Sequence, residues 1–274
     1  MSYHMTIIRP LVSVRPQDSL LHVIKVMQGD YVPKLVVTDE SEHPLGVITQ
    51  KDLVNSIDRL KDRLLADVFV SEVMRKDFIA IEGGVDPIEA ARLLVETKSP
   101  MLVVVSEDRR AIGMILKSDL VSYYGSTVKG VHKVEDVMTR NPITVNESTP
   151  IKDVVETLKA KGLGRVPVVD NSGKVVGMLT SADVVPIIPV LARSNCGDIP
   201  VKEFMNTNIN VANPEEDLGF IAKTMMQRRV KSFIVLDSNG KPVGIVTSSD
   251  IVKALTDEKT RRFLVEIKMY TATF

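Results

Sequence analysis

Hydrophobic and polar positions follow one pattern four times along this chain. In its third and clearest copy, the β-branched run 142–145 predicts a short strand. Thr149 and Pro150 then form a helix start, with a hydroxyl cap and a first-turn proline. Gly162 closes that helix. Its apolar face is predicted by four residues at helical spacing, namely Ile151, Val154, Val155 and Leu158.

The second half of this copy reads as a hairpin followed by a helix. Strands are predicted at 166–169 and 175–179, with the turn 170–173 between them. A second helix opens at 180–183, and prolines at 186 and 189 cut it short. The order is strand, helix, strand, strand, helix, so the fold class is α/β (α+β).

The other copies repeat this order. Their first strands are predicted near 12–14, 78–81 and 209–211, their first helices near 19–28, 87–97 and 215–229, and their middle strands at 34–38, 101–105 and 232–236.

A short motif marks the end of each copy's hairpin. Gly46-Val-Ile-Thr-Gln-Lys-Asp52 is followed by related segments that begin at Gly113, Gly177 and Gly244, at intervals of 67, 64 and 67 residues. A second short motif precedes the first strand of repeats 2, 3 and 4 and ends in a methionine, at Met74, Met138 and Met205. Four copies at one period indicate four copies of one supersecondary unit.

These two motifs resemble those of the cystathionine β-synthase (CBS) domain, and the likeness covers almost the whole chain. The resemblance implies two Bateman modules, formed by repeats 1–2 and 3–4, with adenosine ligands bound in the cleft of each pair. The γ subunit of AMP-activated protein kinase and stand-alone archaeal proteins share this four-copy layout. Boundaries are placed at 7–62, 68–128, 132–192 and 199–260, with a C-terminal extension at 261–274.

The motif has a chemistry that suits a nucleotide. A threonine that ends a strand and an aspartate in the next helical turn place exposed N–H groups, a hydroxyl and a carboxylate together. The carboxylate can accept both hydroxyls of a ribose, while a nearby cation binds the phosphate. The candidate ligand residues are Thr49, Asp52, Asp119, Thr144, Arg165, Thr180, Asp183, Lys231, Thr247, Ser249 and Asp250.

The same residues also have a purely structural interpretation, because Ser/Thr-x-x-Asp before an apolar run resembles a capping box. Both roles are compatible. The copies differ, since Leu116 replaces the threonine of repeat 2. Arg165 and Lys231 are interpreted as equivalent cations, with Pro33 and Pro100 at their places in repeats 1 and 2, although Lys34 partly substitutes. The C-terminal module is therefore expected to bind phosphate more strongly.

Composition narrows the class of protein. Lysine and arginine balance aspartate and glutamate, 35 against 35, which argues against nucleic-acid binding. No apolar run approaches the roughly 20 residues that span a bilayer, and the N-terminal residues do not read as a secretory signal. Cys196 is the only cysteine, and the four histidines lack metal-ligand spacing. A cytoplasmic protein without membrane contact is expected.

The leading hypothesis is a non-catalytic regulatory protein without a cofactor that senses AMP, ADP or ATP. It would pass its state to an unknown effector protein or through a homodimer. The alternatives are a scaffold whose clefts bind nothing, and a binder of S-adenosylmethionine or nucleic acid.

The C-terminal tail is a separate question. Its apolar residues alternate with partly polar ones, as in a half-buried strand, at Phe263, Val265, Ile267 and Met269. Either an edge strand that completes the fold or a partner-binding strand is expected.

Overall fold

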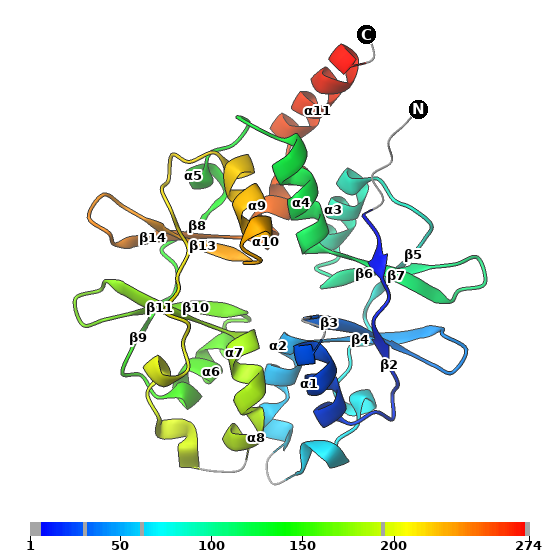
Figure 1. Cartoon of the computed structure of the whole chain (residues 1–274), viewed down its shortest axis with the longest axis vertical. Helices are drawn as coiled ribbons and strands as arrows, with labels where there is room; N and C mark the ends of the chain where they lie inside the picture. The colour runs from blue at the N-terminus through cyan, green and yellow to red at the C-terminus, as the bar shows by residue number, and fades with distance from the viewer. Residues whose placement is uncertain (1–6, 30–31, 61–62, 193–194, 272–274) are drawn as a thin grey trace.

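The computed structural model describes residues 7–29, 32–60, 63–192 and 195–271, and it contains the four repeats arranged around a common centre (Figure 1). Repeat 1 comprises β2 (Ser13–Val14), α1 (Leu20–Gly29), β3 (Lys34–Thr38), β4 (Pro44–Thr49) and α2 (Gln50–Asn55). Repeat 2 comprises β5 (Ile79–Glu82), α3 (Pro87–Glu96), β6 (Met101–Val105), β7 (Ala111–Leu116) and α4 (Lys117–Thr127).

Repeats 3 and 4 follow the same order. Repeat 3 comprises β9 (Val145–Asn146), α6 (Ile151–Ala160), β10 (Arg165–Val169), β11 (Val175–Thr180) and α7 (Ser181–Val184), and α8 (Ile188–Leu191) follows it. Repeat 4 comprises β12 (Val211–Ala212), α9 (Leu218–Gln227), β13 (Ser232–Leu236), β14 (Pro242–Thr247) and α10 (Ser248–Leu255). The predicted α/β order is therefore confirmed.

Each repeat contains a small sheet. The middle and third strands form an antiparallel hairpin, and the first strand pairs in parallel with the middle one. The first strands of repeats 1, 3 and 4 have only two residues, because each pairs with only two residues of its neighbour. The strand predicted at 142–145 accordingly reduces to β9.

Linkers between the repeats extend these sheets. Before repeat 1, β1 (Arg9–Pro10) pairs with β7 of repeat 2, and before repeat 3, β8 (Thr139–Arg140) pairs with β14 of repeat 4. Bridges join Val47 to Arg75 and Met178 to Asn206 in the same way. Each repeat therefore receives a linker segment along its third strand, one residue beyond the glycine of its motif.

Close approach of the linker explains the repeated glycines. A Cβ atom on Gly46 would lie 2.5 Å from the backbone oxygen of Arg75 and 3.1 Å from the sulfur of Met74. Gly177 and Gly244 meet the side chains of Met205 and Met138 in the same way. In repeats 1, 3 and 4 the glycine and the methionine of the two motifs are thus two sides of one contact. A side chain at Gly46 would displace the linker backbone, whereas at Gly177 or Gly244 it would first displace the methionine side chain.

Helices join repeats across the two predicted modules. One core cluster combines residues of repeat 1 and repeat 3, among them Leu53 and Leu158, and a second combines repeats 2 and 4. A third, smaller cluster lies between the sheets of repeats 1 and 2. The sequence predicted only the 1–2 and 3–4 pairs, so the 1–3 and 2–4 cores are an addition from the structure. The 1–3 and 2–4 cores bring the four helices that begin at the Thr/Leu-x-x-Asp motif, α2, α4, α7 and α10, toward the centre of the molecule (Figure 1).

Two local predictions are wrong. Helix α6 has Pro150 as its N-cap residue and no side-chain cap, so Thr149 lies one residue before the cap. The Thr149 carbonyl accepts a hydrogen bond from the backbone N–H of Val201 (2.8 Å). The C-terminal tail is also no strand. It forms the helix α11 (Glu258–Thr271), in which Leu264 is buried while Val265 is exposed, as a helical period requires.

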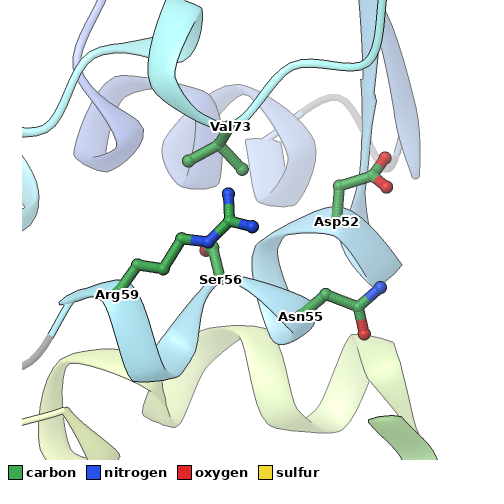
Figure 2. Close-up of a pocket in the computed structure, with 5 residues that line it drawn as sticks. All are labelled: Asp52, Asn55, Ser56, Arg59 and Val73. Atoms are coloured by element: carbon green, nitrogen blue, oxygen red, sulfur yellow. The ribbon is translucent and has the colours of Figure 1, made fainter. Parts of the chain in front are cut away.

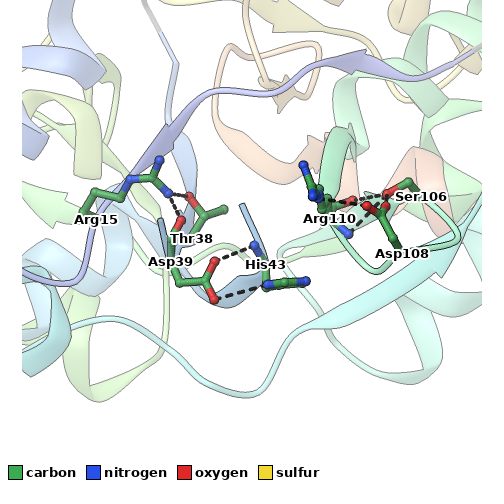
Figure 3. Close-up of polar contacts among 7 residues, drawn as sticks. All are labelled: Arg15, Thr38, Asp39, His43, Ser106, Asp108 and Arg110. Carbon is green, nitrogen blue, oxygen red and sulfur yellow. Dashed lines mark hydrogen bonds and ion pairs between the residues drawn. The ribbon is translucent and has the colours of Figure 1, made fainter. Parts of the chain in front are cut away.

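The hairpin turns of repeats 1 and 2 are joined by a hydrogen bond from the backbone N–H of Ala111 to the Glu42 carbonyl (2.9 Å), and Figure 3 shows polar side chains of both turns. The Asp39 carboxylate accepts a hydrogen bond from the backbone N–H of His43 (2.8 Å), and the Ser106 hydroxyl accepts one from that of Arg110 (3.2 Å). Arg15 donates 2.7 Å to the buried Thr38 hydroxyl. The two backbone hydrogen bonds close the two turns, and the Arg15 contact gives the buried Thr38 hydroxyl a hydrogen-bond partner.

Candidate ligand site

The threonine and aspartate of the motif contact each other in repeats 1, 3 and 4. In repeat 3, Asp183 Oδ2 accepts hydrogen bonds from the backbone N–H (2.8 Å) and hydroxyl (2.6 Å) of Thr180. The corresponding distances to Asp52 are 2.9 and 2.6 Å in repeat 1, and those to Asp250 are 2.7 and 2.7 Å in repeat 4. The capping-box interpretation is confirmed in repeats 1 and 4, where the threonine hydroxyl also accepts a backbone N–H of the first helical turn. In repeat 3 the Thr180 side chain makes no such cap.

One carboxylate oxygen remains available in these three repeats. All of the hydrogen bonds from threonine to aspartate end on Oδ2, and Oδ1 of Asp52, Asp183 and Asp250 receives no hydrogen bond from the described residues. The three aspartates are half-buried, and burial raises the pKa of Asp52 and of Asp250 against the opposing effect of the threonine hydrogen bonds. The hydrogen bonds to Oδ2 fix the orientation of each carboxylate. A ligand hydroxyl could therefore donate a hydrogen bond to Oδ1 without any movement of the aspartate side chain.

Repeat 2 differs in both partners of the pair. Asp119 Oδ2 accepts a hydrogen bond from the Leu116 backbone N–H (2.8 Å), and Leu116 has no hydroxyl to add a second one. The guanidinium of Arg9, from the N-terminal strand β1, binds Oδ1 through its Nε. Both carboxylate oxygens of Asp119 are thus in use.

Strand register corrects the assignment of the cations. Arg165 opposes Thr180 across its hairpin, and the residues that oppose the threonine position in repeats 1, 2 and 4 are Lys34, Met101 and Ser232. Lys231 lies one residue earlier, so it is not equivalent to Arg165. Repeats 1 and 3 therefore share the full set of threonine, aspartate and opposing cation, and the reasoning that favoured the C-terminal module no longer holds.

Cations near these motifs link different repeats through neutral acceptors. Arg165 Nη1 of repeat 3 donates to the Ser232 hydroxyl of repeat 4 at 2.7 Å, and Lys34 of repeat 1 donates to the Pro100 carbonyl of repeat 2. Lys117 Nζ of repeat 2 donates to the Ser249 hydroxyl of repeat 4 at 2.9 Å. The carbonyl and hydroxyls carry no charge that would offset that of the cations.

The enclosure of these cations lowers their pKa values. Burial, with the charges of Lys117 and Lys231, lowers the pKa of Lys34 to about 7. Partial desolvation and the charges of Arg165 and Arg9 also lower the pKa of Lys231, although this side chain is exposed to solvent. Burial also lowers the pKa of Arg165 to about 10, against the charges of Asp183 and Asp250. A multivalent anion near these side chains would relieve their repulsion.

A small cavity of about 100 Å³ lies beside Asp52 in repeat 1. Figure 2 shows the Arg59 guanidinium next to Val73, with Asp52 and Asn55 on the other side. Typical ligand pockets measure roughly 300–1,000 Å³, so this space admits a small group and not a whole nucleoside without side-chain movement.

The remaining candidates occupy different surroundings. Ser249 is exposed and accepts the Lys117 hydrogen bond, whereas Thr144 is half-buried immediately before β9. Sequence reasoning missed Arg9 and Lys117 altogether. Counting back from the motif glycine would have aligned Lys34 with Arg165, since each lies twelve residues before it.

Two kinds of feature are absent from the part of the chain that the structure describes. No group of three or more His, Cys, Asp or Glu side chains comes together there as a metal site would require. None of the helices in that part of the chain has the length and apolar character of a bilayer-spanning segment.

Comparison with known sequences identifies the class of this protein. The CBS domain family matches residues 5–59, 70–126, 134–189 and 201–257, so the chain belongs to that family. Protein MJ1225 of Methanocaldococcus jannaschii is 22% identical over 267 residues, which cover 89% of this chain and 95% of MJ1225. Its crystal structure, described as that of a proposed archaeal homologue of γ-AMPK, has a TM-score of 0.82 and covers 91% of this chain and 98% of that one, at 21% identity.

Two further matches support the fold of this chain but say nothing about its ligand. The structure of an uncharacterized protein from Pyrococcus horikoshii has a TM-score of 0.65 at 21% identity and covers 93% of this chain and 100% of that chain. A homoserine O-acetyltransferase of Methanohalobium evestigatum is 30% identical over 127 residues, which cover 46% of this chain and only 25% of that enzyme. These likenesses establish a four-repeat CBS fold and leave the ligand to be argued from the site.

Proposed function

We propose that this chain is a regulatory protein that binds an adenosine ligand, AMP, ADP or ATP, at the aspartates of repeats 1, 3 and 4. The observation that carries the proposal is that Oδ1 of Asp52, Asp183 and Asp250 accepts no hydrogen bond from the residues the structure describes, while the threonine holds Oδ2. A ribose diol would donate to Oδ1, and hydrogen bonds to a charged group contribute roughly 1.5–3 kcal/mol each.

The phosphate would bind to the cations that now donate to neutral acceptors. Lys34 and Arg165 oppose the threonines of repeats 1 and 3, and Lys117 and Lys231 lie near enough to Lys34 to lower its pKa. Because these side chains also bridge different repeats, an anion that draws them away would alter the contacts between repeats. A separate effector protein, or a second copy of this chain, would then respond to the change. A ligand shifts such an equilibrium only by its differential affinity for the two states.

Replacing Asp183 by asparagine tests the proposal. The amide keeps the shape of the cap but loses the charge, and we expect AMP to bind the altered repeat about 10- to 100-fold more weakly, at 1.4 kcal/mol per decade. Isothermal titration calorimetry measures the change. Asp86→Asn is the matched control, because Asp86 caps α3 without belonging to a motif. Equal losses in the two variants would mean that only helix capping is being measured.

A thermal shift separates the sensor from a scaffold with empty clefts. At 100 times the dissociation constant a ligand adds about 2.7 kcal/mol of stability. AMP, ADP, ATP and S-adenosylmethionine, which also carries an adenosine, are the probes. If none of the four raises the melting temperature, the scaffold interpretation replaces the one proposed here.

A further inference from the structure

One arginine position in the linkers faces a different partner in repeat 1 than in repeat 2. Arg9 is paired with Met114, and Arg75 with Val47, in both cases the residue after the motif glycine. The same position in repeats 3 and 4 is taken by Asn206 and Thr139. The backbone therefore delivers an arginine to repeats 1 and 2 only.

In repeat 2 the linker arginine forms an ion pair with the aspartate of the motif. Arg9 Nε binds Asp119 Oδ1, and Arg9 Nη2 donates to the Ser118 hydroxyl at 3.1 Å. The Asp119 side chain is 10% exposed beneath this contact. A ribose hydroxyl would have to displace a charged hydrogen bond to reach that oxygen.

In repeat 1 the equivalent arginine is held away. Arg75 makes a bidentate ion pair with Asp77, at 2.7 Å from Nη2 and 3.3 Å from Nε, and Asp52 Oδ1 stays free among the described residues. Asp77 follows Arg75 by two residues, and the residue two after Arg9 is Leu11, which packs on the apolar cluster between the sheets. Arg9 therefore lacks the local carboxylate that Arg75 has.

We propose that the linker arginine decides whether the aspartate of a repeat can accept a ligand hydroxyl: Arg9 closes repeat 2, and Asp77 keeps repeat 1 open by holding Arg75. This inference rests on the proposed function and specifies which repeats can be occupied. It also makes the N-terminal strand a regulatory element, because any event that withdraws β1 from β7 frees Asp119.

Arg9→Gln is the direct test, with AMP as the probe in isothermal titration calorimetry of the full chain. We expect this variant to bind one additional AMP per chain relative to the unaltered protein. The additional site should vanish in the Arg9→Gln, Asp119→Asn double variant. If Arg9→Gln binds fewer AMP molecules, Arg9 is itself a ligand group, and if it binds the same number, Arg9 does not close the site. Either result overturns the inference.

Asp77→Asn tests the opposite direction at an exposed position that does not challenge folding. Freed from Asp77, Arg75 should turn to Asp52, and AMP affinity at one site should fall about tenfold, as expected when a charged competitor occupies an acceptor. Asp108→Asn is the matched control, since it removes a comparable surface pair with Arg110. Unchanged affinity in Asp77→Asn would count against the inference. Failure of the unaltered chain and all variants to bind any adenosine ligand would overturn the proposed function as well.

Discussion

Replacing Gly125 by valine is expected to lower the free energy of unfolding by about 3 kcal/mol, the upper end of the usual cost of overpacking. Gly125 lies in α4 of repeat 2 where it crosses α9 of repeat 4, and a Cβ atom there would lie 2.6 Å from the backbone nitrogen of Lys223. Because the obstacle is backbone, no rotamer change can relieve the clash. The two helices would have to separate and open the core that joins repeats 2 and 4.

Urea denaturation of the variant measures this cost, and Gly84→Val provides the control. Gly84 is exposed, and an added Cβ there meets no atom within 4 Å, so its substitution should change stability by less than about 0.5 kcal/mol. Comparable unfolding midpoints for Gly125→Val and the unaltered protein would mean that α4 and α9 do not cross as closely as described. Gly125→Ala should give an intermediate loss.

The order of elements could be predicted because it depends on local patterns. The apolar stripe of α6, the turn at 170–173 and the position of Gly162, whose φ is +62°, are all determined within about ten residues of chain. Positive φ at Gly162 ends a helix at low cost only for glycine. These elements hold in the structure with shifts of one to three residues at their ends.

Contacts between repeats could not be predicted in the same way. The glycine and methionine motifs were visible separately, but Gly177 meets Met205 only because a linker crosses the third strand, which no local pattern indicates. The 1–3 and 2–4 cores likewise depend on how two modules face each other. The cation assignment failed by a single residue of register, which is enough to turn a side chain to the other face of a strand.

The tail shows where periodicity alone is ambiguous. Phe263, Val265 and Ile267 alternate as a strand would, yet Leu264 between them is the buried residue and Val265 is 57% exposed. Phe263, Leu264 and Ile267 lie on one side of a helix at spacings of three and four. The segment 263–269 has only seven residues and no turn signals, so its sequence fits both the two-residue period of a strand and the 3.6-residue period of a helix. Contact with α10 selects the helix.

Nucleotide affinity is expected to fall as pH rises through 7, because the phosphate requires a protonated Lys34. Burial holds the pKa of this ammonium at about 7 in the free protein, well below its ordinary value of 10.5. Above pH 7 the free protein has lost the proton, and binding must restore it. For one required proton the affinity for AMP should drop about 20-fold between pH 6.5 and 8.5. The phosphate itself becomes more negative with pH only up to about 7, so it opposes the trend only at the lower end.

The same depressed pKa has an opposite consequence for stability. Between about pH 7 and 10.5 the unfolded chain binds a proton at Lys34 that the folded chain has released, so this group makes stability rise with pH in that window. If AMP affinity falls while the free energy of unfolding rises over the same pH range, the loss of affinity comes from deprotonation of a binding-site cation and not from unfolding of the protein. Calorimetry of AMP binding in two buffers of different ionisation enthalpy should show proton uptake approaching one per occupied repeat 1 site at pH 8. Adenosine, which lacks the phosphate, and Lys34→Met should both show neither the uptake nor the affinity change, and persistence of either in Lys34→Met would assign the titration to Lys231 instead.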